Sequence, residues 1–195
     1  MDDDRNGWAL PENESARFAY ENGDFVWASK VENLRPHLLA APLAEAFDLG
    51  ELDMLDVVVR ADVTPIQGAA AMGVFCREVP DTDADFQWYE FVVRDGYAAI
   101  RIADTDGRLD VLATSDEVDL PDGERSTVEA ACRDDDRGHG QLWLTVNDAL
   151  ILHATHDEPL GNGAAGLQAY DGPASASPER FVIRWHDFAV FQPAD

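Results

Sequence analysis

Alternating apolar and polar residues, in short runs separated by turn residues, make up most of the chain. The run 52–64 shows the pattern clearly, because every second residue from Val57 to Val63 is apolar. Side chains of a β-strand point alternately to its two faces, so this run predicts a strand with one buried face. Similar runs recur along the chain and predict about twelve or thirteen strands.

Residues 70–112 carry the densest series of these runs and predict four strands joined by three turns. The first turn is the polar segment PDTDAD (80–85), whose residue types favour turns. Asp95-Gly96 is a strong signal for a two-residue hairpin turn, and Thr105-Asp106-Gly107 predicts the third turn. The strand between the first two turns, FQWYEFVVR, carries large side chains on both of its faces.

Turn signals and a change of phase mark strands nearer the two ends of the chain. Asn22-Gly23-Asp24 predicts a hairpin in the first part of the sequence, and Asn147-Asp148 predicts another in the second half. The last apolar run, 180–192, changes phase between Trp185 and Phe188. Such a shift predicts a β-bulge in the final strand.

Many short strands with short links and almost no helical pattern predict an all-β fold. The expected architecture is a two-sheet antiparallel β-sandwich of the jelly-roll type. No linker, low-complexity tract or fixed-period repeat divides the sequence. We therefore expect residues 1–195 to form a single domain in which 1–17 is an irregular N-terminal segment.

The composition is strongly acidic, with 39 Asp and Glu residues against 14 Lys and Arg and a net charge of −25. Nucleic acid as a partner is excluded, because phosphate binding needs clustered Lys and Arg. Solubility, adaptation to high salt and calcium binding each explain the acidity. An apolar fraction of 46% is enough to build a core, so the chain is not a disordered tail.

Membrane insertion is not expected, because no apolar run reaches the ~18 residues that span a bilayer. The N-terminal residues MDDDRNGWALPENES do not show the basic and apolar regions of a signal peptide. Two locations follow from this. Either the protein is cytoplasmic, or this sequence begins after a removed signal or anchor.

The motifs resemble those of the concanavalin A-like (laminin G-like) jelly-roll superfamily, most closely bacterial domains grouped with the 3-keto-disaccharide hydrolase-like family. The shared features are a Gly-aliphatic-x-Cys-Arg strand (GVFCRE), an acidic turn (PDTDAD), an aromatic strand (FQWYEFVV) and an Asp-Gly-Tyr turn (RDGYAAI). Later matches are LWLTVNDALI, in which Asp148 stands where Gly is usual, AAGLQAY and RWHDFAVF. The resemblance covers roughly 18–191 and implies the jelly-roll fold. The superfamily includes lectins, adhesion domains and glycosidases, so the fold alone does not define an activity.

The resemblance also implies a disulfide between Cys76 and Cys132, because similar domains tend to carry cysteines at both places. Each cysteine lies on the apolar face of its predicted strand. The alternative is a pair of buried free thiols, which pack well as small hydrophobic groups. A disulfide predicts an extracytoplasmic protein, secreted or anchored to the cell envelope, whereas free thiols favour the cytoplasm.

A ligand-binding surface is predicted from residues on the outward faces of the strands. Trp88, Glu90, Arg101 and Trp143 all receive this outward assignment. Flat aromatic rings cover the C–H patches of a sugar, and charged groups bind its hydroxyls, so these residues predict a carbohydrate platform. The alternative is that the second face is also buried and that these side chains only pack.

Three acidic or histidine-containing motifs are candidates for a catalytic or metal-binding site. Glu51, Asp53 and Asp56 in ELDMLD have a spacing comparable to the carboxylates of laminarinase-like glycosidases, but their position at the entry to a strand favours a solvated acidic edge. His153 and His156 would make a metal pair on a helix, whereas a strand is predicted there. The remaining motif, Asp104-Thr-Asp106-Gly107, resembles a fragment of a calcium loop, although turn formation alone explains it.

These observations favour a non-catalytic extracytoplasmic β-sandwich module that binds a glycan, a cell-envelope component or a protein partner. The one cofactor that the motifs indicate is calcium, at Asp104 and Asp106. Two alternatives stay open: a glycoside-acting hydrolase that uses a carboxylate pair, and a purely structural or interaction domain.

Overall fold

The computed structural model describes residues 16–29, 37–40, 56–67, 70–80, 86–171 and 181–192, which contain thirteen β-strands and no helix. The all-β prediction is therefore confirmed. The strands are β1 (Ala16–Glu21), β2 (Asp24–Ser29), β3 (His37–Ala40), β4 (Val57–Gln67), β5 (Ala70–Pro80), β6 (Phe86–Arg94), β7 (Tyr97–Asp104), β8 (Leu109–Ser115), β9 (Ser126–Asp134), β10 (Gly140–Val146), β11 (Ala149–His156), β12 (Ala164–Asp171) and β13 (Phe181–Phe191).

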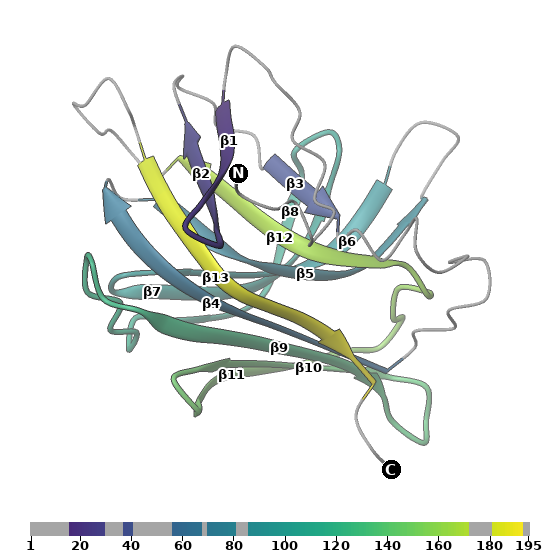
Figure 1. Ribbon diagram of the computed structural model, residues 1–195. Helices are drawn as coiled ribbons and strands as arrows, with labels where there is room; N and C mark the ends of the chain where they lie inside the picture. The colour runs from purple at the N-terminus through teal and green to yellow at the C-terminus, as the bar shows by residue number, and fades with distance from the viewer. Residues whose placement is uncertain are drawn as a thin grey trace.

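The strands form two antiparallel sheets that pack face to face (Figure 1). The seven-stranded sheet has the order β1-β2-β13-β4-β9-β10-β11, and the six-stranded sheet has the order β3-β12-β5-β6-β7-β8. The chain crosses between the sheets after β2, β3, β4, β8, β11 and β12, which gives the predicted sandwich. Among the described elements there is no helix long and apolar enough to cross a membrane.

The turns form where the sequence predicts them. Residues 70–112 give β5 to β8, and the predicted Asp95-Gly96 turn separates β6 from β7, with Gly96 at a φ of +67°. Asn147 and Asp148 have φ values of 50° and 63° between β10 and β11. Asn and Asp tolerate this left-handed conformation better than other non-glycine residues, which explains why they occupy a two-residue hairpin turn.

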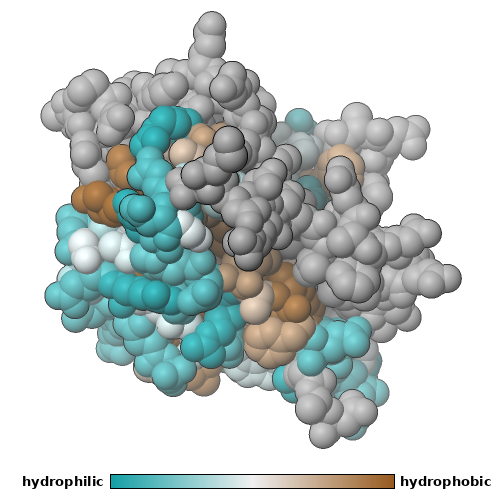
Figure 2. Space-filling view, viewed as in Figure 1, coloured by the Kyte–Doolittle hydropathy of each residue, from teal (hydrophilic) through white to brown (hydrophobic). Residues whose placement is uncertain are grey.

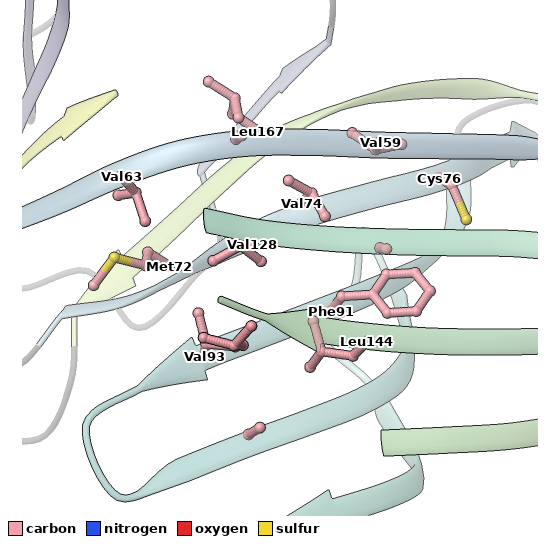
Figure 3. Close-up of a cluster of buried hydrophobic side chains, with 14 of the residues drawn as sticks. Val59, Val63, Met72, Val74, Cys76, Phe91, Val93, Val128, Leu144 and Leu167 are labelled. Carbon is pink, nitrogen blue, oxygen red and sulfur yellow. The ribbon is translucent and has the colours of Figure 1, made fainter. Parts of the chain in front are cut away.

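The core lies between the two sheets, where alternate residues from both meet. From the six-stranded sheet, Met72, Val74 and Phe91 point inward toward Val59 and Val128 of the seven-stranded sheet (Figure 3). Each is at most 2% exposed. The predicted bulge is also present, because the register of β13 against β4 shifts between Trp185 and Phe188.

The six-stranded sheet has both faces buried at its centre, whereas the part of its partner formed by β9 and β10 has one half-exposed face. Strands β9 and β10 alternate between buried and half-buried residues, as a half-exposed sheet requires. In β6, the six consecutive residues from Trp88 to Val93 are all buried. In the space-filling view, hydrophilic residues cover much of the described surface on one side of the molecule (Figure 2).

A disulfide joins Cys76 of β5 to Cys132 of β9 and so links the two sheets through the core. The Cα atoms are 6.8 Å apart, and both residues are fully buried. The predicted pairing is confirmed. The bond closes a loop with a sequence separation of 56 residues, which corresponds to about 4 kcal/mol in the chain-entropy description of disulfide stabilisation.

Reduction of this disulfide should lower the free energy of unfolding by about 4 kcal/mol, measured by urea denaturation with and without a reductant. Chemical reduction keeps both sulfur atoms in the core, so it separates loss of the cross-link from loss of packing. The double substitution Cys76→Ala/Cys132→Ala should cost at least as much. Equal urea midpoints for the oxidised and reduced protein would contradict the assignment.

Candidate functional site

Three of the four residues predicted to bind a ligand lie together on the outer face of the six-stranded sheet. Trp88 and Glu90 are two residues apart on β6, and Glu90 is paired in register with Arg101 of β7. Arg101 Nε lies 2.6 Å from Glu90 Oε1. Alternation along the strands therefore placed these three residues on one face, as the sequence predicted.

This cluster is buried, so the structure does not present it as an open platform. Trp88 and Glu90 are 1% exposed and Arg101 is 8% exposed. Burial raises the pKa of Glu90, and the Arg101 guanidinium and the Trp88 indole act in the opposite direction. A buried ion pair is costly to break, because removing one partner leaves the other charge uncompensated. The cluster therefore has a structural role in the state described.

Gln168 belongs to the same outer face and was missed by sequence reasoning. It lies on β12 opposite Gly73 of β5 and is fully buried, and neither polar atom of its side-chain amide has a hydrogen-bond partner among the residues that the structure describes. Its position two strands away from β6 depends on the order β12-β5-β6. Nothing in the local sequence GLQAY indicates that a crossover strand brings Gln168 to this face.

Trp143, the fourth predicted ligand residue, lies on the outer face of the other sheet. It is half-buried on β10 and stacks on His153 of β11, with ring centroids 5.2 Å apart and an interplanar angle of 15°. The side-chain oxygen of Gln141 accepts hydrogen bonds from His153 Nε2 at 2.9 Å and from Thr155 Oγ1 at 3.1 Å. Trp88 and Trp143 therefore lie on opposite sides of the sandwich and do not form one site.

An accessible pocket of about 280 Å³ lies where the edges of the two sheets meet. One wall comes from β6, β7, β8 and the turn between β7 and β8, and the other comes from the end of β11 and the loop that follows it. We call this the edge pocket. Its lining residues are Gln87, Ile102, Ala103, Asp104, Arg108, Asp110, His156, Glu158 and Leu160.

Tyr89 fixes the far wall of the edge pocket from inside the core. Its hydroxyl accepts a hydrogen bond from the Leu160 backbone N–H at 2.9 Å and lies 2.8 Å from His156 Nδ1. Burial raises the pKa of Tyr89, so the hydroxyl keeps its proton and forms a hydrogen bond with the imidazole ring of His156.

Asp104, Arg108 and Asp110 form the opposite wall. Asp104 Oδ1 accepts the Arg108 backbone N–H at 2.8 Å, and Arg108 Nη2 lies 2.9 Å from Asp110 Oδ2. The Asp104 contact closes the turn after β7, a role that needs no metal. The structure adds no further ligand to the calcium site predicted at Asp104 and Asp106, since the described residues contain no group of three or more side chains that could hold a metal ion.

Two other motifs are separated by the strand geometry or fall outside the described residues. His153 and His156 are both on β11 but make different contacts, His153 with Gln141 on the outer face and His156 with buried Tyr89. Asp56 is exposed and its Oδ1 accepts the Asp134 backbone N–H at 3.2 Å. Glu51 and Asp53, the other carboxylates of ELDMLD, lie outside the described residues.

A hydrogen-bonded series that sequence reasoning did not find connects β2, β13 and β4. His186 Nδ1 donates to Asp24 Oδ1 at 2.9 Å, and His186 Nε2 is hydrogen-bonded to Thr64 Oγ1 at 2.8 Å. Burial acts to raise the pKa of Asp24, but the contacts with His186 and Arg184 outweigh it and leave that pKa lowered. The three side chains come from three neighbouring strands, so this series holds the outer face of the seven-stranded sheet together.

Solved structures share the fold over nearly the whole chain. A carbohydrate-binding module, CBM66 from Bacillus subtilis, has a TM-score of 0.63 and 12% sequence identity, over 95% of each chain. The carbohydrate recognition domain of Emp46p in its potassium-bound form has a TM-score of 0.62 and 10% identity, covering 97% of this chain and 90% of that one. The PL-14 alginate lyase from Aplysia kurodai has a TM-score of 0.56 and 9% identity, with 92% and 88% covered.

These likenesses define a jelly-roll β-sandwich of the type found in lectins and carbohydrate-binding modules. At such low identity they show the fold and not the activity. No protein-family model matches the sequence, and no curated protein matches it either.

Replacing one member of the buried ion pair should destabilise the fold more than replacing both. Glu90→Gln leaves the Arg101 charge buried without its partner and should cost about 3–5 kcal/mol in the free energy of unfolding. The double variant Glu90→Leu/Arg101→Met should recover most of that loss, because neither charge remains. Chemical denaturation of the three proteins tests this. Equal loss in the single and double variants would show that the pair is not the source of the effect.

Proposed function

We propose that this protein is a non-catalytic carbohydrate-binding module that takes a sugar residue in the edge pocket. The observation that carries the proposal is the composition of the pocket wall. Apolar side chains of Ile102 and Leu160 lie beside hydrogen-bonding groups of Gln87, His156 and Asp110. A sugar ring presents the matching combination, apolar C–H patches together with hydroxyl groups that both donate and accept.

The size of the pocket favours a small ligand or the end of a longer one. Pockets for drug-sized molecules measure roughly 300–1,000 Å³, and the edge pocket, at about 280 Å³, lies just below that range. His156 offers its Nε2 for a hydrogen bond, and Asp110 offers a carboxylate acceptor. These two groups come from different sheets, so the position of one relative to the other depends on the packing of the sandwich.

The fold and the disulfide support a role outside the cytoplasm. Structural neighbours with the same sandwich include a carbohydrate-binding module and a carbohydrate recognition domain. Structural disulfides are typical of oxidising compartments, and Cys76–Cys132 is such a bond. The proposal also includes a relationship between this chain and the laminin G-like and 3-keto-disaccharide hydrolase-like domains, which the shared motifs support.

A second candidate surface is the stack of Trp143 on His153. Its specific support is a half-buried indole next to Gln141, whose side chain is held by two hydrogen bonds. A sugar ring packed on the outer side of the indole would use the same aromatic contact that lectins use. Substitutions in the edge pocket and at Trp143, each followed by a measurement of glycan affinity, distinguish the two surfaces.

Glycan binding is tested by calorimetry with neutral oligosaccharides, cello- and chito-oligosaccharides as the first probes. Gln87→Ala and Asp110→Ala each remove one hydrogen-bonding group from the edge pocket and should weaken affinity about tenfold. Trp143→Ala is the matched control at the second surface and should leave affinity unchanged. All three residues are at least partly exposed, so the variants should fold.

Three results would change the proposal. Affinity lost only with Trp143→Ala would move the site to the second surface. Release of shortened sugars would favour the hydrolase alternative. A failure of every glycan to bind would favour a structural or protein-interaction domain.

A further inference from the structure

We propose that the edge pocket selects glycans that carry a free amino group, such as de-N-acetylated hexosamine chains, and discriminates against acidic polysaccharides. This inference rests on the proposed function, since it names the class of sugar that the same pocket takes. It depends on the charges that line the pocket and on the charge of the whole molecule.

The pocket wall carries more negative than positive charge. Asp104, Asp110 and Glu158 contribute three carboxylates, whereas Arg108 contributes the one guanidinium among the lining residues. Arg108 pairs with Asp110 through its side chain and with Asp104 only through its backbone N–H. Its guanidinium therefore offsets one carboxylate, and the lining residues carry two more carboxylates than guanidinium groups.

Tyr89 sets the orientation of His156 in the pocket wall. His156 Nδ1 lies 2.8 Å from the Tyr89 hydroxyl oxygen, which also accepts the Leu160 backbone N–H at 2.9 Å. Because Nδ1 is engaged by Tyr89, Nε2 is the ring nitrogen that is left to contact a sugar hydroxyl.

Apolar groups distinguish this pocket from a simple acidic surface. Ile102, Ala103 and Leu160 form part of the wall, so a bound cation must also present C–H surface. A metal ion does not meet that requirement, and the described residues contain no cluster of metal-ligating side chains. An amino sugar provides both a positive charge and C–H surface, because its ammonium group pairs with a carboxylate and its ring is apolar on one side.

The charge of the whole protein acts in the same direction. A net charge of −25 produces a negative potential around the molecule, which attracts cationic chains and repels anionic ones. An acidic polymer such as alginate is therefore disfavoured, although an alginate lyase is among the structures that share this fold. The long-range part of the potential is screened by salt, while a direct pair inside the pocket is screened less.

The test compares three oligosaccharides of equal length by calorimetry at pH 6: chitosan, chitin and alginate oligomers. Chitosan should bind about tenfold more tightly than chitin, as expected for one added ion pair near a protein surface, and alginate should show no binding. Glu158→Gln and Asp110→Asn should each remove most of the preference for chitosan over chitin.

Asp148→Asn is the matched control because it removes the same charge at the opposite end of β11. Asp148 lies in the β10–β11 turn at a φ of 63°, a conformation that Asn tolerates. Its substitution should leave the chitosan preference intact. An equal loss with Asp148→Asn would show that the overall field, and not the pocket, selects the ligand, and would overturn the inference.

The remaining outcomes separate this inference from the proposed function. Equal affinity for chitosan and chitin would overturn the amino-sugar preference while leaving glycan binding in place. No binding of any sugar would overturn both. Pocket-dependent binding of polylysine with an affinity equal to that of chitosan would show that the pocket takes a cationic peptide, and would also contradict the inference.

Discussion

The alternation of side chains along antiparallel strands is the constraint on which the rest of this structure depends. Each strand turns apolar residues toward the partner sheet, because the space between the two sheets excludes water and forms the main core. That requirement sets Val59 and Val128 against Val74 and Phe91, and it brings Cys76 opposite Cys132. The outer faces and the edges then receive the residues that the core does not use.

Sequence reasoning predicted most of the fold because its signals are local. Period-2 alternation and two-residue turns such as Asp95-Gly96 and Asn147-Asp148 define strands and hairpins without reference to distant residues. Even the bulge in β13 appeared as a change of phase between Trp185 and Phe188. The family resemblance added the expectation of a disulfide between Cys76 and Cys132, and the structure contains that bond.

The candidate site was harder to predict, because an outward direction is not the same as exposure. Trp88, Glu90 and Arg101 do point away from the core, yet they are buried. The sequence held a signal for this, since FQWYEFVVR carries large side chains on both faces, a pattern typical of strands buried on both sides. By contrast, Trp143 belongs to a strand with regular alternation and is only half-buried.

The edge pocket depends on contacts between residues far apart in the chain. Tyr89 and His156 are 67 residues apart, and their hydrogen bond forms only because the edges of two different sheets meet. Neither residue belongs to a motif that indicates a pocket. The acidity of the protein was visible from the start, but the structure was needed to show which carboxylates are offset by a guanidinium. Together these features describe a sandwich whose interior is fixed by packing and whose edge is available for recognition.

Chemical-shift mapping by NMR tests the central claim, that a sugar binds between the sheet edges, most directly. On titration with an oligosaccharide, the account predicts shifts in the backbone resonances of Ile102, Asp110 and Glu158 and in the imidazole of His156. The indole N–H of Trp143 should stay unchanged. Shifts confined to the Trp143 indole and its neighbours on β10 and β11 would contradict the account.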